Sequence, residues 1–123
     1  MAVPNLKSDT LVVEPERAVY HLTGTSLVKI LDGVPTDYAY FLEQISVANR
    51  GTVSANVTIT IRSGDSSGTD YHLCNRRALQ IKNAFNAAQG RSHILSEGDE
   101  MWAKLEAAGN VDIVIPYTKA HET

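Results

Sequence analysis

The sequence predicts an all-β fold, an antiparallel β-sandwich of the jelly-roll kind with about seven or eight short strands. Apolar and polar side chains alternate through Ser54–Ile61 and again through Asn110–Ile115, which is the period of a strand with one buried face. Turn residues such as Gly109-Asn110 separate these segments, and such turns recur about every eight to twelve residues. This spacing is typical of a small sandwich.

Composition limits the classes of protein that remain. A chain of 123 residues with 43% hydrophobic and 20% charged residues is large enough to bury one core without disulfides or metal. The formal net charge of -3 and the lack of a basic patch argue against nucleic-acid binding. No signal peptide and no apolar run of about 20 residues is visible, so we expect no membrane partner and synthesis in the cytoplasm. The single Cys74 is expected to be a small buried hydrophobe.

The domain organisation follows from the prolines and the alternating segments. Residues 1–17 contain Pro4 and Pro15, which remove ladder donors, so this segment is expected to be an extended arm. Residues 18–119 form the single sandwich domain, and residues 120–123 form a short tail. Within the domain the expected strands are Ala18–Thr23, Ser26–Leu31, Tyr38–Val47, Ser54–Ile61 and Ala78–Lys82, with an irregular loop from there to Gly90.

Ile94–Tyr117 predicts the closing hairpin of the sandwich. An alternating strand follows Glu97-Gly98-Asp99, and Gly109-Asn110 turns the chain into a second alternating strand. The apolar sets of the two best segments are the predicted core. They comprise Val57, Ile59, Ile61, Leu95, Trp102, Val111, Ile113 and Ile115.

No catalytic, cofactor or metal site is predicted. The four histidines, at positions 21, 72, 93 and 121, share no metal-ligand spacing. The acidic side chains around Glu97–Glu106 are more simply explained as solvated turn and strand residues than as a glycosidase carboxylate pair. The sequence therefore predicts a protein that is not an enzyme and needs no cofactor.

Two kinds of segment are candidate protein interfaces. The apolar centre of the N-terminal arm suits strand addition or draping onto an adjacent subunit. The one basic doublet could meet the acidic turn of an adjacent copy. The predicted interface residues are Leu11, Val12, Val13, Arg76, Arg77, Glu97, Asp99 and Glu100.

Two pairs of segments carry a resemblance to a family. Ile45–Gly51 runs into Ala55–Ile61, and Ile94–Ala103 runs into Val111–Ile115. Their order resembles small β-sandwich virion proteins of tailed bacteriophages, in which a Val-Ala-Asn strand end precedes an alternating Val/Thr strand and a Leu-x-x-Gly-Asp segment precedes the final hairpin. The resemblance covers roughly residues 41–117, and the stretch from Tyr71 to Ser92 departs from it.

The resemblance implies a function and a set of partners. Such proteins decorate or cement the capsid, build the head–tail neck or collar, or complete the tail. The implied protein is a non-enzymatic virion component present in multiple copies. Its partners would be copies of itself and the major capsid, portal or connector, or tail proteins of the same virion.

Two other classes remain open. A carbohydrate-binding jelly-roll module, used for example in host-surface attachment, could stack sugars on Tyr38, Tyr40, Tyr71 and Trp102. A cupin-like metalloenzyme is the third hypothesis, and the lack of a close histidine pair argues against it.

Overall fold

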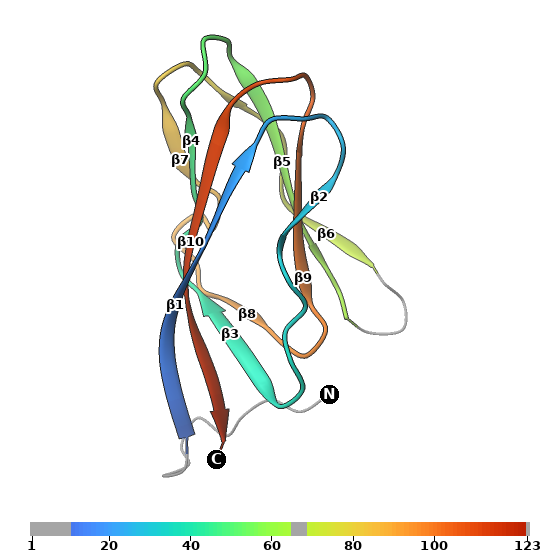
Figure 1. Ribbon diagram of the computed structural model, residues 1–123, viewed down its shortest axis with the longest axis vertical. Coiled ribbons are helices and arrows are strands. Elements are labelled where there is room, and N and C mark those ends of the chain that lie inside the picture. Colours follow the sequence, from blue (N-terminus) through green and yellow to red (C-terminus); the bar gives the residue numbers. More distant parts are fainter. Residues whose placement is uncertain (1–10, 65–68, 123) are drawn as a thin grey trace.

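The computed structural model describes residues 11–64 and 69–122, and they form ten strands and no helix. Figure 1 shows the strands in two layers. The all-β antiparallel sandwich predicted from the sequence is confirmed. No helix in the described part of the chain is long and apolar enough to cross a membrane. The strands are β1 (Leu11–Leu22), β2 (Val28–Leu31), β3 (Tyr38–Leu42), β4 (Ser46–Asn49), β5 (Ala55–Arg62), β6 (Asp70–Leu79), β7 (Ala84–Asn86), β8 (His93–Leu95), β9 (Glu100–Leu105) and β10 (Val111–Glu122).

Sheet A is built around the long strand β10. One edge of β10 pairs with β1 over the whole of both strands, from Leu11 opposite Glu122 to Leu22 opposite Val111. Its other edge pairs with β4 in the first part of β10 and with β3 in the second, and β7 and β8 extend those two strands outward. Figure 1 shows β1 and β10 side by side along the length of the molecule.

Sheet B has the order β2-β9-β5-β6 and forms the second layer. The strand predicted over Ser54–Ile61 is β5, at Ala55–Arg62. The expected closing hairpin does not form. β9 pairs with β2 and β5 in sheet B, whereas β10 belongs to sheet A. Gly109-Asn110 therefore carries the chain from one layer to the other. Turn chemistry alone does not distinguish a hairpin from such a crossing.

The single strand expected over Tyr38–Val47 is divided into β3 and β4 by a bulge. Leu42 lies opposite Tyr117 and Ser46 lies opposite Val114, so three residues of the connection face two of β10. The amide of Ile45 donates to Asn86 Oδ1 at 2.9 Å, and its carbonyl accepts from the Ala87 amide at 2.8 Å. Both backbone groups of Ile45, which do not pair with β10, are thus satisfied by the last residue of β7 and the residue after it.

The two ends of the chain also differ from the expected boundaries. Residues 11–17, expected in the arm, are the first half of β1, and residues 120–122, expected in the tail, complete β10. The two segments pair with each other, and Pro15 is tolerated because β1 is an edge strand. Residues 1–10 lie outside the described residues. The strand expected at Ala78–Lys82 ends at Leu79, and the expected loop after it contains β7.

The core lies between the inward faces of the two sheets, and most of the predicted set belongs to it. Val57, Leu95 and the apolar residues of β10 are buried, as is Ile59. Ile61 is partly buried at the margin of the core. The prediction that Trp102 belongs to the core is wrong. Met101, Ala103 and Leu105 are the buried side chains of β9, so alternation places Trp102 on the outer face of sheet B. Cys74 is buried as expected, and burial raises the pKa of its thiol.

Candidate protein-docking surface

The outer faces of the two sheets differ in chemistry. The outer face of sheet B is polar, and several of its side chains are paired with one another. Trp102 Nε1 donates to Glu100 Oε1 at 3.0 Å, and Lys29 Nζ lies 3.0 Å from Glu100 Oε2. The Arg62 guanidinium lies 4.5 Å from the centre of the Trp102 ring and donates to Asp70 at 2.8 Å. These four charged side chains are thus paired with one another, while Lys104 on the same face has no ion partner among the described residues.

The outer face of sheet A is apolar along its centre. The register of β1, β10, β3 and β8 places the outward side chains in rows across the sheet. Val13, Val19 and Ile94 are 56%, 63% and 55% exposed, which is high for branched aliphatic residues. We call this surface the sheet-A face. It comprises Val13, Pro15, Arg17, Val19, Phe41, Ile94, Val114, Pro116 and Thr118.

A hollow of about 330 Å³ lies in the middle of the sheet-A face. Pro15, Phe41 and Pro116 form its apolar walls, and Glu43 and Gln44 of the β3–β4 bulge form its polar rim. The bulge creates the hollow, because its extra residue bends the strand away from β10 beside Pro116. Pro116 occupies the interval of β10 between its two partner strands, where a missing N–H interrupts no pairing with β3 or β4.

The free edge of β1 borders the sheet-A face, and no strand of residues 11–64 or 69–122 pairs with it. Glu14 and Glu16 project from β1 on the inner side of sheet A, where Lys119 Nζ lies 3.7 and 3.3 Å from their carboxylates. The hydrogen bond to Glu16 is the main cause of a raised pKa of Lys119. Inward-pointing charges and a proline are the devices by which natural edge strands avoid further strand pairing. The face of sheet A is therefore a better docking surface than its edge.

A second hollow, of about 320 Å³, opens between the two sheets beside β1 and β2. Tyr40 and Tyr117 line it, with ring centres 4.8 Å apart, and burial is the main cause of the raised pKa of both phenols. Ala18 and Asp32 complete the rim from β1 and from the end of β2. This hollow lies at the margin of the sandwich, where sheet B stops and sheet A continues.

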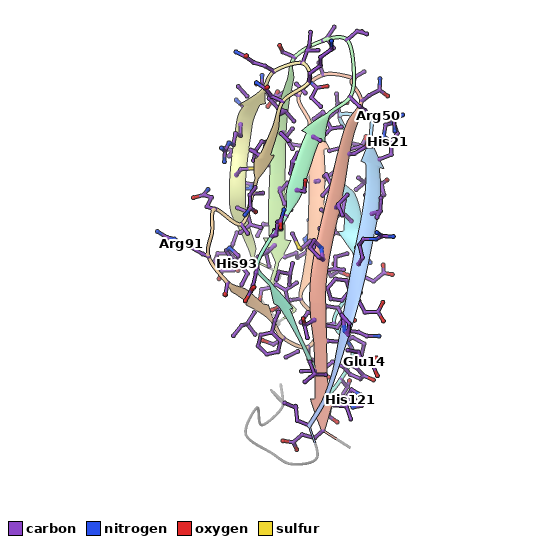
Figure 2. All side chains as sticks on the ribbon, turned by 90° about the vertical axis from the view of Figure 1, so that its left-hand side faces the viewer. Glu14, His21, Arg50, Arg91, His93 and His121 are labelled. Carbon is purple, nitrogen blue, oxygen red and sulfur yellow. The ribbon has the colours of Figure 1, made fainter. Side chains whose placement is uncertain are left out.

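A polar cluster lies at one end of the β1–β10 ladder. His21 Nδ1 lies 2.7 Å from Asp112 Oδ1, and Asp112 Oδ2 also accepts from Arg50 at 3.4 Å. The remaining ring nitrogen of His21 lies 3.2 Å from Asn110 Oδ1. Figure 2 shows His21 and Arg50 together near one end, and Glu14 and His121 near the other. The cluster ties the start of β10 to β1 and to the end of β4.

The predicted interface residues are dispersed over the molecule. Leu11, Val12 and Val13 lie in β1, where Val13 is exposed and the other two are half-buried. Arg76 forms an ion pair with Glu106, and Arg77 lies 4.0 Å from the centre of the Phe85 ring, where it joins the edges of the two sheets. Their role in binding a partner stays a prediction.

The acidic turn at Glu97, Asp99 and Glu100 has a structural task. The Asp99 carboxylate accepts from the amide of Gly64 at 2.8 Å and from that of Ser96 at 2.9 Å. The Gly98 amide donates to the carbonyl of Val34, whose own amide donates to the Asp99 carbonyl. Asp99 thereby holds three loops together, and Glu100 is paired with Lys29 as described above.

Sequence reasoning missed the residues that shape the sheet-A face. Arg17 was placed in the arm, and Glu43 and Pro116 were read only as parts of longer strands. Residues 11–17 show no clear alternation of apolar and polar side chains, so the one available signal is that Pro15 is compatible with an edge strand continuous with the strand expected at Ala18–Thr23.

The alternative sites have limited support in the geometry. The four aromatic residues of the carbohydrate hypothesis are divided between the sheets, with Tyr38 stacked on His121 and Trp102 covered by cations. No group of three His, Cys, Asp or Glu side chains suited to a metal ion occurs among the residues that the structure describes.

Comparisons with known proteins show the fold at low sequence identity. No protein-family model and no curated protein matches the chain. A capsid structure of the Helicobacter pylori bacteriophage KHP30 matches with a TM-score of 0.54 and 9% identity over 92% of this chain and 93% of that one. A disulfide-linked pilus of Bacillus endospore appendages matches with a TM-score of 0.52 and 14% identity over 96% and 97%.

A third similar structure is the core of a Drosophila nucleoplasmin-like protein, described for its pentamer formation and histone binding. It has a TM-score of 0.52 and 10% identity over 84% of this chain and 97% of that one. The fold thus occurs in structural proteins of a phage capsid and of a pilus, as well as in this oligomeric core.

Proposed function

We propose that the protein is a non-enzymatic structural subunit of a bacteriophage virion. It is present in multiple copies and docks on the head surface as a decoration or cement protein, or at the head–tail neck, where it stabilises the particle. The observation that carries this proposal is the sheet-A face, an apolar surface on a sandwich whose other outer face is polar.

Physical reasoning supports a protein partner for this face. Three branched aliphatic side chains more than half exposed on one sheet are a free-energy cost in water, which burial against another protein removes. The hollow beside Pro116 gives the face relief that a complementary surface can fill. The similarity of fold to the phage capsid protein supports a virion as the assembly.

The partners in this proposal are copies of the chain itself and the major capsid, portal or connector, or tail proteins of the same virion. The charged groups predicted as contacts, including Arg76 and Glu97, would act at the margins of such interfaces. Rim charges there affect the rate and orientation of docking more than its affinity.

The test is incorporation into particles. Particles from the producing host are purified by density banding, and the protein is quantified in them by mass spectrometry, as wild type and with Val19→Asp and Ile94→Asp together. We expect the wild type in a fixed ratio to the major capsid protein and the variant at less than about a tenth of that level, since each buried aspartate costs several kcal/mol. Lys104→Asp, on the outer face of sheet B, is the control and should incorporate normally. Absence of the wild type from particles contradicts the proposal.

A further inference from the structure

We propose that the sheet-A face docks onto the same face of a second copy of this chain, about a two-fold axis that runs along β10. This inference rests on the proposed function, since it names the first partner in the assembly. The partner is a second copy of the chain because the cationic group and the anionic group that would pair across the contact lie on the same face. A two-fold interface requires a self-complementary patch of this kind.

The charges on the face carry the argument. Arg17 of β1 lies opposite Pro116, and Glu43 of the bulge lines the hollow on the other side of the same proline. Both side chains are exposed, and neither has an ion partner among the described residues. They lie on either side of β10 at the same position along that strand, Arg17 on the β1 side and Glu43 on the β3–β4 side.

A rotation of 180° about β10 exchanges these two sides. It places Arg17 of one copy over Glu43 of the other, and by symmetry this ion pair forms twice. The same rotation places Pro15 over Phe41 of the second copy, since both residues lie opposite Thr118. Val19 comes over Ser46, since both lie opposite Val114.

The resulting contact has the layout of a stable interface. Prolines and the Phe41 ring occupy its centre, and two ion pairs lie on either side of the axis. Sheets packed face to face lie about 10 Å apart and about 30° from parallel, and residues near the axis keep their partners under such a tilt. Pro15 and its partner Phe41 lie one row from Pro116, close to the middle of the contact. The protected edge of β1 favours this face-to-face contact over strand addition.

Charge reversal tests the contact in the purified full-length protein. The dimer dissociation constant is measured by analytical ultracentrifugation for wild type, Arg17→Glu, Glu43→Arg and the double variant. We expect each single variant to raise the dissociation constant more than about tenfold, because it places like charges together at two sites, and the double variant to recover most of that loss. Lys104→Glu on the outer face of sheet B is the matched control and should leave the constant unchanged. Circular dichroism checks that every variant is folded.

The outcomes separate this inference from the proposed function. A wild type that stays monomeric at concentrations of hundreds of micromolar, or a double variant no tighter than either single one, overturns the two-fold contact. If the same charge reversals abolish incorporation into particles while the wild type is a monomer in solution, the face binds a different virion protein. The two-fold inference then fails and the proposed function stands. A dimer that follows the expected pattern but never enters particles supports the contact and contradicts the proposed function.

Discussion

The backbones of Gly64 and Gly98 lie against each other where the β5–β6 loop meets the turn between β8 and β9. A β-carbon on Gly64 would overlap the Gly98 Cα and carbonyl carbon and would lie 2.7 Å from the amide nitrogen of Asp99. Gly98 also has a φ of 83°, which a side chain disfavours. Neither contacting group can move without displacing the loops that Asp99 fastens.

Gly64→Ala should therefore destabilise the protein by about 2–3 kcal/mol, the cost of forced overpacking against backbone. Gly24→Ala is the matched control, because nothing lies within 4 Å of a β-carbon there. Urea unfolding of both variants measures the difference. Equal stabilities would show that the two loops are not in contact.

Asn49 links the two sheets through a fully satisfied side chain. It is 4% exposed, its amide donates to the carbonyls of Val53 and Leu79, and its Oδ1 accepts from Gly51. Asn49→Ala removes three hydrogen bonds and should cost about 2–4 kcal/mol in the free energy of unfolding. Asn56→Ala, at an exposed position of β5, should change it by less than about half a kcal/mol. Chemical denaturation followed by circular dichroism distinguishes the two.

The burial of Ile113 in β10 and the exposure of Ile94 in β8 predict opposite outcomes for these two isoleucines. Ile113 is fully buried, so Ile113→Ala should cost about 2–5 kcal/mol, and Ile59→Ala should behave alike. Ile94→Ala, 55% exposed on the sheet-A face, should be close to neutral in the isolated protein. A large loss at Ile94 together with a small one at Ile113 would mean that the faces of sheet A are reversed.

Glu100 makes part of the stability depend on pH. Its hydrogen bonds, first to Lys29 and then to Trp102, lower the pKa of its carboxyl, and its side chain is 23% exposed. Because the pKa is lower in the folded state, the ionised carboxylate stabilises the fold above its unfolded pKa, about 4.3. That stabilisation is lost as the pH falls through the folded-state pKa.

Glu100→Gln should accordingly reduce stability by about 1 kcal/mol at pH 7, with the difference from wild type shrinking as the pH falls below the unfolded-state pKa of about 4.3 and vanishing below the lower folded-state pKa. Glu97→Gln, at a residue with no ion partner among those described, is the control and should show little difference at either pH. A deficit for Glu100→Gln that persists at low pH would mean that its carboxylate charge is not what stabilises the wild type.

The sequence predicted the fold class and the best strands because alternation reports burial directly. The apolar residues of Ser54–Ile61 and Asn110–Ile115 lie on the inner face of their sheets, so the pattern of side-chain types is strong, although Thr58 and Thr60 on the other side of β5 are buried as well. The strand pairing could not be read in the same way. Gly109-Asn110 has the chemistry of a hairpin turn, yet β9 and β10 lie in different sheets, because the pairing depends on which neighbours complete each layer.

The candidate surface was predictable only in part. Val13 was identified within its segment, but Pro15 was read as the mark of an unpaired arm, and the strand expected at Ala18–Thr23 was therefore not extended back to Leu11. Trp102 was assigned to the core because large aromatic residues are mostly buried, whereas stacking against Arg62 and Lys29 gives its ring a partner on the outer face. A bulge such as that between β3 and β4 leaves no clear mark in a single sequence.

The central claim is that the sheet-A face is the surface covered in the assembled state. Hydroxyl-radical footprinting read by mass spectrometry tests it directly, since Phe41 on that face and Trp102 on the opposite outer face are both reactive and both partly exposed. In particles compared with the free chain diluted below its dimer dissociation constant, we expect labelling of Phe41 to fall several-fold and labelling of Trp102 to stay unchanged. Unchanged labelling of Phe41, or protection of Trp102 alone, would contradict the account.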